Sequence, residues 1–285
     1  MLVARSEARI GRAGVKSTVL LERQVRGTVV LRDELAFDSR FAAAAAGRLE
    51  PVGHVFLLLA GRFVVDGATY PAPVAHILGD DELERVRDGS RTFRTDGPRA
   101  HVIQLRLAKA HVHAPIGLAH GPLRLPDACW DAAAALVDDT RALARLLDAL
   151  AAAGATDPHL ASTLFEQEPE RFSRLWGALE PLYATYGGTT SLKQLAASLG
   201  LSLRQISRDA KELAKAFGFT SGYRDALLML RLRTAVLLLS APEAAVADVA
   251  RVVGYGSAIA MARAFRDAKL PAPTVVQDAM RNGAE

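Results

Sequence analysis

The segment SLKQLAASLGLSLRQISRDAKELAKAFG, residues 191–218, decides the fold of the C-terminal third of the chain. From Leu192 to Leu199, apolar residues recur at the spacing i, i+3, i+4 and i+7, which predicts one apolar face of a short helix. Gly200 follows and can adopt the left-handed conformation that ends a helix. Ser202 can then cap a second helix through its hydroxyl oxygen. The segment therefore predicts two helices joined by a tight turn.

The same pattern recurs nearer the C-terminus. In AVADVARVVG, the apolar residues from Val246 to Val253 repeat the spacing of the first copy, 54 residues further along. Gly254 ends this helix, and Ser257 can cap the next one. A helix, a short glycine turn and a capped helix make up the helix-turn-helix motif. We therefore predict an all-α domain with two such units, joined by one long helix over residues 223–240.

The second helix of each unit carries side chains suited to reading DNA. In a helix-turn-helix motif this helix enters the major groove, and its first turns face the base edges. Arginine can donate two hydrogen bonds to guanine, and glutamine can pair with adenine. The alternative for each of these side chains is an ordinary solvated surface. The candidate DNA-binding residues are Arg204, Gln205, Ser207, Arg208, Lys211, Ser257, Arg263 and Arg266.

Apolar residues in these two helices have other expected roles. Leu203 and Ile206 are expected to anchor the first recognition helix. In the second unit, Ala258, Ile259 and Ala260 occupy the leading turn. Small apolar side chains can touch a thymine methyl group but carry little hydrogen-bond information. The second unit is therefore expected to read DNA less strongly than the first.

The composition fits a nucleic-acid-binding protein with a separate middle segment. The chain has 285 residues, of which 50% are hydrophobic, which allows about two domains. Its net charge of +4 divides into +5 in 1–126, −6 in 127–188 and +5 in 189–285. The basic end suggests nucleic acid and the acidic middle a partner-facing spacer. The alternative is mixed solvated surfaces, which charge alone favours. A single cysteine, no signal peptide and no long apolar run predict a cytoplasmic protein without a disulfide framework or a membrane partner.

Residues 1–126 are predicted to form strands and turns. Ala60-Gly61, Asp66-Gly67 and Asp96-Gly97-Pro98 separate runs of β-branched and aromatic residues and are expected to be turns. Strands at this spacing predict a small sandwich or barrel. We expect a ligand cavity bounded by the strands of 53–107. The alternative is an interior filled by its own Phe, Leu and Val side chains.

Residues 127–188 are predicted to be helical. From Cys129 to Leu150, residues recur at alternating spacings of four and three, the heptad pattern of a coiled-coil seam. Two interpretations remain open: a helix that forms a dimer, or a helix that packs on its own domain. Pro181 is expected to kink or split a later helix. The segment 127–188 is therefore interpreted as a dimerisation or linker segment, followed by a DNA-binding domain over 189–285.

The chain resembles the AraC-type transcriptional regulators over roughly residues 190–280. The matching stretches are LAASLGLSLRQISR, RLRTAVLLL and VARVVGYGS…ARAFRDAKLPAP. The resemblance implies two helix-turn-helix subdomains on one linker helix, both reading the major groove on one face of DNA. It also implies an N-terminal cupin-like sensor barrel with a helical dimerisation segment, hence an α+β protein with a small-molecule effector. Carried over by position, the base readers are Arg204, Ser207, Arg208 and Arg263, with Ala258 and Ala260 in weakly reading positions.

Histidines in the N-terminal region are the candidate metal ligands of the sequence. His111 and His113 alternate on a strand and could share one face, with His101 and His120 as further ligands. No carboxylate follows at cupin-like spacing, so we predict neither a metal nor another cofactor. No catalytic or phosphate-binding motif is found. The sequence thus predicts a dimeric, sequence-specific regulator bound to double-stranded DNA, and not an enzyme. The alternative is a cupin-type metal-dependent enzyme with an appended helical domain.

Overall fold

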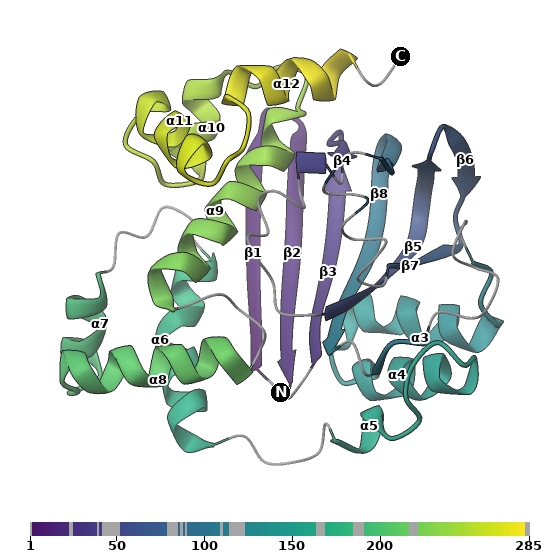
Figure 1. Cartoon of the computed structure of the whole chain (residues 1–285), viewed down its shortest axis with the longest axis horizontal. Coiled ribbons are helices and arrows are strands. Elements are labelled where there is room, and N and C mark those ends of the chain that lie inside the picture. The colour runs from purple at the N-terminus through teal and green to yellow at the C-terminus, as the bar shows by residue number, and fades with distance from the viewer. Residues whose placement is uncertain are drawn as a thin grey trace.

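An antiparallel sheet forms the centre of the protein, and helices lie along two sides of it (Figure 1). The structure is a computed structural model, and it describes residues 2–22, 25–38, 40–41, 52–78, 85, 88, 90–108, 111–113, 123–163, 169–184, 191–216 and 222–282. Strands come first along the chain and helices follow, so the predicted α+β class is confirmed.

The described strands belong to one sheet of eight. They are β1 Leu2–Ile10, β2 Ala13–Glu22, β3 Val25–Asp33, β4 Phe37–Asp38, β5 Val52–Val65, β6 Ala68–Pro71, β7 Val74–Leu78 and β8 Phe93–Ala108. Their order is β1-β2-β3-β8-β5-β6, while β4 pairs with β8 and β7 pairs with β5. Among the described strands no pairing joins β1 to β6, so this sheet is open. The cupin-like form of the predicted barrel is therefore not confirmed.

One of the three predicted turns is confirmed, and the other two are wrong. Asp66-Gly67 joins β5 to β6, and both residues have positive φ, as a two-residue hairpin requires. Ala60-Gly61 lies inside β5 at a β-bulge, where the backbone of Gly61 approaches Arg99 O so closely that a Cβ would lie 2.5 Å from it. Residues 96–98 continue β8, and Asp96 pairs with Arg62 of β5.

Helices make up the rest of the described chain. They are α3 Asp127–Asp138, α4 Ala142–Ala152, α5 Leu160–Thr163, α6 Glu170–Ala184, α7 Leu192–Ser198, α8 Leu203–Ala216, α9 Tyr223–Leu239, α10 Val246–Val252, α11 Ala258–Asp267 and α12 Pro273–Asn282. Pro181 does not split its helix, because α6 continues past it to Ala184. The long helix predicted between the two units is confirmed as α9.

The predicted heptad seam is buried within one chain. A break after Asp138 separates α3 from α4, and the two helices pack against each other. Cys129, Leu136, Leu143 and Leu147 are all at most 2% exposed, in a core shared with β3, β5 and β8. Of the two interpretations left open by the sequence, the structure shows packing on the chain's own sheet. A continuous seam helix is therefore wrong.

Both helix-turn-helix units share cores with the first two strands. Leu2 and Ala4 of β1 lie in one core with α6, α7 and α8. Ala8 of β1 and Val15 of β2 lie in another core with α9 to α12. Trp176 Nε1 of α6 donates a hydrogen bond to Val3 O at 3.2 Å, which ties α6 to the edge of the sheet. These cores contain residues from both sides of positions 126 and 188. The domain boundaries at those positions therefore stay a prediction.

A separate hydrophobic cluster lies on one face of β5 and β8, and its large side chains pack against one another. Phe63 meets Phe93 edge to face with ring centroids 4.6 Å apart, and Phe56 lies 5.0 Å from Phe93. His76 stacks on Phe93 at 5.0 Å, and its burial lowers the pKa of the imidazole to about 4. These contacts favour the filled interior that was the alternative to a ligand cavity among the strands of 53–107.

Candidate nucleic-acid interface

The first helix-turn-helix unit consists of α7 and α8. Ser191 and Gln194 form a capping box at the start of α7, in which each side chain bonds the other residue's backbone N–H. At its end, Gly200 has φ of 64° and Leu201 N donates to Ala196 O at 2.9 Å. This is the hydrogen-bond pattern of a Schellman turn, and it directs the chain sharply into α8.

The second unit, α10 and α11, is built in the same way. Gly254 has φ of 84°, and Tyr255 N donates to Ala250 O at 2.8 Å, which repeats the Schellman turn. The turn is one residue longer than the first, because Tyr255 and Gly256 stand where the first unit has Leu201 alone. Burial raises the pKa of Tyr255 to about 12, and Arg231 of α9 lies over its ring at 5.8 Å. The predicted repeat is therefore present in three dimensions.

The serine caps of α8 and α11 allow the two helices to be compared position by position. Ser202 Oγ accepts from Gln205 N at 3.2 Å, and Ser257 Oγ accepts from Ala260 N at 3.1 Å. Counting from the caps, Ile206 corresponds to Met261, and both side chains are fully buried. The same count pairs the other positions: Arg204 with Ile259, Gln205 with Ala260, Ser207 with Ala262, Arg208 with Arg263, Ala210 with Phe265 and Lys211 with Arg266.

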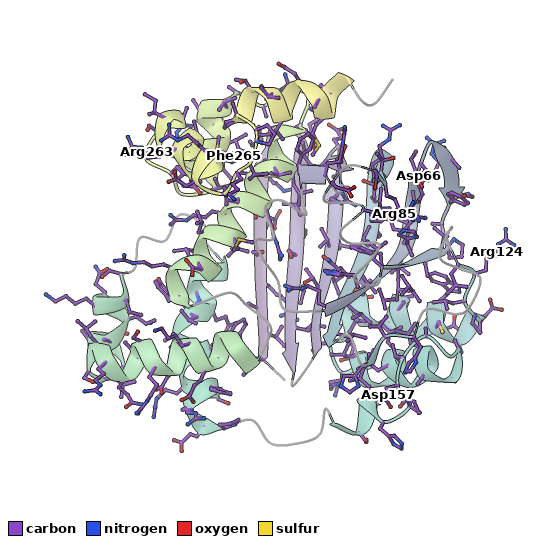
Figure 2. The ribbon with its side chains drawn as sticks, in the orientation of Figure 1. Asp66, Arg85, Arg124, Asp157, Arg263 and Phe265 are labelled. Carbon is purple, nitrogen blue, oxygen red and sulfur yellow. The ribbon has the colours of Figure 1, made fainter. Side chains whose placement is uncertain are left out.

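The predicted contact residues lie on the outer side of the two helices. Five are exposed charged side chains: Arg204, Arg208, Lys211, Arg263 and Arg266. Gln205 and Ser207 are half-buried, while Ser257 is exposed at its cap. In Figure 2, Arg263 points away from the body of the protein, whereas Phe265 on the same helix is fully buried. One sequence-based expectation is wrong: Leu203 is 50% exposed and does not anchor α8, although Ile206 does.

Hydrogen bonds along α8 hold two of the candidate readers. Gln205 Nε2 donates to Asp209 Oδ1 at 2.8 Å, and Arg208 Nη2 donates to Gln205 Oε1. Asp209 is buried, and Arg174 of α6 lies 4.0 Å from it, so its carboxylate is a fixed acceptor behind the helix. Asp209 was not among the predicted residues. Its position four residues after Gln205 was the signal, because residues at that spacing meet on one helix face.

Helix α9 fixes the two units relative to each other. Its residues Leu232, Ala235, Val236 and Leu239 are buried in the core of the second unit. Its first residue, Tyr223, is buried in the core of the first unit. The two units therefore sit at opposite ends of α9, on the β1 side of the sheet (Figure 1).

The histidines considered for a metal do not gather in the described structure. His111 Nδ1 lies 3.4 Å from Asp157 Oδ2, whereas His113 is exposed. His101 lies on β8, paired with Leu31, and His120 is outside the described residues. Among the described residues no group of three or more His, Cys, Asp or Glu side chains could hold a metal ion. Nor does any described helix combine the length and apolar character that crossing a bilayer requires.

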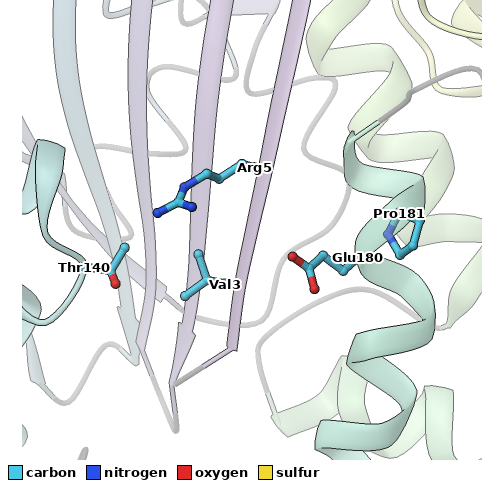
Figure 3. Close-up of a pocket in the computed structure, with 5 residues that line it drawn as sticks. All are labelled: Val3, Arg5, Thr140, Glu180 and Pro181. Atoms are coloured by element: carbon cyan, nitrogen blue, oxygen red, sulfur yellow. The ribbon is translucent and has the colours of Figure 1, made fainter.

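A cavity lies where β1 faces α6. It has a volume of about 410 Å³ and is lined by Val3, Arg5, Thr140, Glu180 and Pro181. Figure 3 shows the Glu180 carboxylate pointing toward β1, whereas the Arg5 side chain extends from that strand toward Thr140, away from Glu180. This cavity is outside the 53–107 strands in which the sequence placed a ligand. It adjoins α6, the helix that packs on the first helix-turn-helix unit.

Solved structures similar to this chain include transcription regulators. ToxT from Vibrio cholerae is 7% identical, with 90% of this chain and 98% of that chain covered and a TM-score of 0.39. The AraC-like transcriptional activator CuxR is 12% identical, with 77% and 80% covered and a TM-score of 0.35. A DNA-binding transcriptional dual regulator from Escherichia coli K-12 is 19% identical, with 41% and 97% covered and a TM-score of 0.32.

AraC-like regulators are thus among the structures that this chain is similar to, as the sequence resemblance predicted. No model of a known protein family matches the chain, and no curated protein matches its sequence. At these identities and TM-scores, any conclusion about function rests on this chain's own residues.

Proposed function

We propose that the protein is a transcription regulator that binds double-stranded DNA through α8 and α11 in the major groove. The observation that carries the proposal is the repeated geometry: two serine-capped helices in the same register, each after a Schellman turn, with exposed basic side chains. A helix of this kind presents its N-terminal turns to base edges. Two copies held by one helix, α9, suit a single DNA site read at two places.

The residues of α8 divide into base readers and phosphate contacts. Arg204 and Arg208 lie within two turns of the Ser202 cap, where an arginine can donate two hydrogen bonds to guanine. The Asp209–Gln205–Arg208 chain limits the freedom of the Arg208 side chain before DNA binds. Lys211 lies further along the helix and is assigned to phosphate. Such contacts position a protein on DNA without reading sequence.

In the second unit, Arg263 and Arg266 have the corresponding assignments. Arg263 occupies the position of Arg208 and is assigned to a base or its flanking phosphate. Arg266 occupies the position of Lys211 and is assigned to phosphate. Ser257 caps α11 and is assigned to phosphate, because the N-terminus of a helix favours anions.

A small-molecule effector is part of the proposal, and the cavity at Arg5 and Glu180 is its candidate site. Its volume of about 410 Å³ falls within the range of ligand pockets, roughly 300–1,000 Å³. Helix α6 lines the cavity and packs on α8, so a ligand there would act directly on the first unit. Thr140→Trp, which fills the space, should abolish an effector response while leaving DNA binding without effector unchanged.

The homodimer and the cytoplasmic location stay predictions. The seam that suggested a dimer is buried within one chain, so a dimer would use another surface. Sedimentation velocity across a concentration series tests this point. A protein that remains monomeric throughout the series would contradict the dimer but not DNA binding by two units of one chain.

Selection of binding sites from random duplex DNA tests the proposed function itself. The full-length protein should enrich one site with two separated groups of fixed bases, one for each recognition helix. The double variant Arg204→Ala with Arg208→Ala should enrich a site that has lost one of these groups. Recovery of DNA without any preferred bases would contradict the proposal.

A further inference from the structure

The structure describes only three large apolar side chains that are strongly exposed, and two of them begin the recognition helices. Within the described ranges these are Leu203 at 50%, Ile259 at 75% and Val275 at 53%. Leu203 is the first residue of α8, and Ile259 is the second residue of α11. Leu203 stands one position and Ile259 two positions after its serine cap, so both lie in the first turn, the part of each helix that the proposed function places in the major groove.

Ile259 is the more informative of the two because of its counterpart. Counted from the serine caps, it stands where the first unit has Arg204, one of the two proposed guanine readers. Its neighbour Ala260 is also exposed, whereas Met261 and Phe265 are fully buried and fix which side of α11 faces outward. The outer side of the first turn is therefore apolar, with Arg263 one turn further along.

We infer that Ile259 reads thymine, by packing against its C5-methyl group in the major groove. Among the base edges of the major groove, the thymine methyl is the apolar group, and aliphatic side chains contact it. A helix held in the groove by Arg263 and Arg266 brings an exposed isoleucine into contact with such a group. The inference rests on the proposed function and adds to it: the first unit prefers guanine through arginine, and the second prefers thymine through Ile259.

Replacing thymine by uracil tests this contact alone, because uracil lacks the methyl group but keeps every hydrogen-bonding group. On the selected site, one thymine in the half read by the second unit should be sensitive to this replacement. The expected loss is about fourfold in affinity, which corresponds to the ~0.8 kcal/mol contributed by one buried methyl group. In Ile259→Ala the ratio between the thymine and uracil sites should fall to about one, and in Ile259→Leu most of it should remain.

Val275→Ala is the matched control. Val275 is an exposed aliphatic side chain on α12, outside both recognition helices, so its loss should leave the thymine-to-uracil ratio at the wild-type value. The Ile259 variants should fold, because this side chain is 75% exposed, and circular dichroism checks that they do.

The outcomes separate this inference from the proposed function. A selected site with no uracil-sensitive thymine, or a ratio unchanged in Ile259→Ala, would show that Ile259 does not read thymine while DNA reading by the protein stands. If Ile259 serves instead as a contact for a protein partner, this is the result expected. A protein that selects no DNA sequence would contradict both.

Discussion

Helices α8 and α11 share one backbone design but present different side chains to the outside. Both begin at a serine cap, both follow a Schellman turn, and both bury a large apolar residue four positions after the cap. On the outer side, however, α8 carries Arg204, Gln205 and Arg208, while α11 carries Ile259, Ala260 and Arg263. The two helices therefore share their caps and the buried position four residues after the cap, and they differ most in the exposed first turn.

This difference teaches that fold and specificity are set by separate residues. Each of these helices is held in place by its buried side chains, because a packed core tolerates little change in volume. Its outer positions bear no such restriction, so they can hold arginine in one copy and isoleucine in the other. Substitutions on the buried side should therefore change stability, and those on the outer side should change DNA binding.

The largest expected effect is on the buried side, at the paired positions Phe265 and Ala210. Phe265→Ala leaves a large cavity in the core of the second unit and should reduce the free energy of unfolding by ~3–5 kcal/mol. Ala210→Gly removes one buried methyl group from α8 and should cost ~1 kcal/mol, mostly through helix propensity. Urea denaturation of both variants measures the difference. Equal losses would show that the two cores are not organised as described.

A smaller effect is expected at the start of the first helix of each unit. Helix α7 begins with the Ser191–Gln194 capping box, whereas α10 has Ala245 at its N-cap and no side-chain cap. Ser191→Ala should therefore destabilise the protein by ~1 kcal/mol. Ala245→Ser adds the missing acceptor and should stabilise it by a similar amount. Thermal unfolding of the two variants measures both shifts, and a destabilising Ala245→Ser would argue against the match between the units.

The smallest effect is expected at the paired positions Lys211 and Arg266, which are assigned to phosphate. Each alanine variant should weaken binding to all sequences alike and reduce the slope of log affinity against log salt by ~1. Arg141→Ala provides a control, because Arg141 is exposed in the turn between α3 and α4, away from both units. Titration of specific and random DNA at several salt concentrations measures the slopes. A loss confined to the specific site would instead make Lys211 or Arg266 a base reader.

The helix-turn-helix units could be predicted from the sequence because their signals are local. Glycine after an apolar face and serine before the next helix fix the geometry within a few residues, and Gly200, Ser202, Gly254 and Ser257 all take their predicted places. The exposure of Leu203 could not be predicted in this way. Whether an apolar residue in the first turn is covered depends on neighbouring helices, which the local pattern does not contain.

The N-terminal region was predicted less well because its contacts are long-range. The pairing of β8 with both β3 and β5 carries that strand through residues 96–98, where the sequence alone indicated a turn. The heptad spacing from Cys129 to Leu150 identified the buried side of α3 and α4 correctly. It could not show what covers that side, since a sheet and a second helix both require the same apolar face.

The central claim is that α8 reads bases, and a binding titration of Arg204→Ala and Arg208→Ala tests it most directly. Each variant is compared with the wild-type protein on the selected site and on random DNA, at two salt concentrations. We predict that each loses ~1–3 kcal/mol on the selected site, with relaxed preference at one base position and little change on random DNA. If both variants keep the wild-type preference for the selected site, α8 is not a recognition helix and its arginines are ordinary solvated side chains.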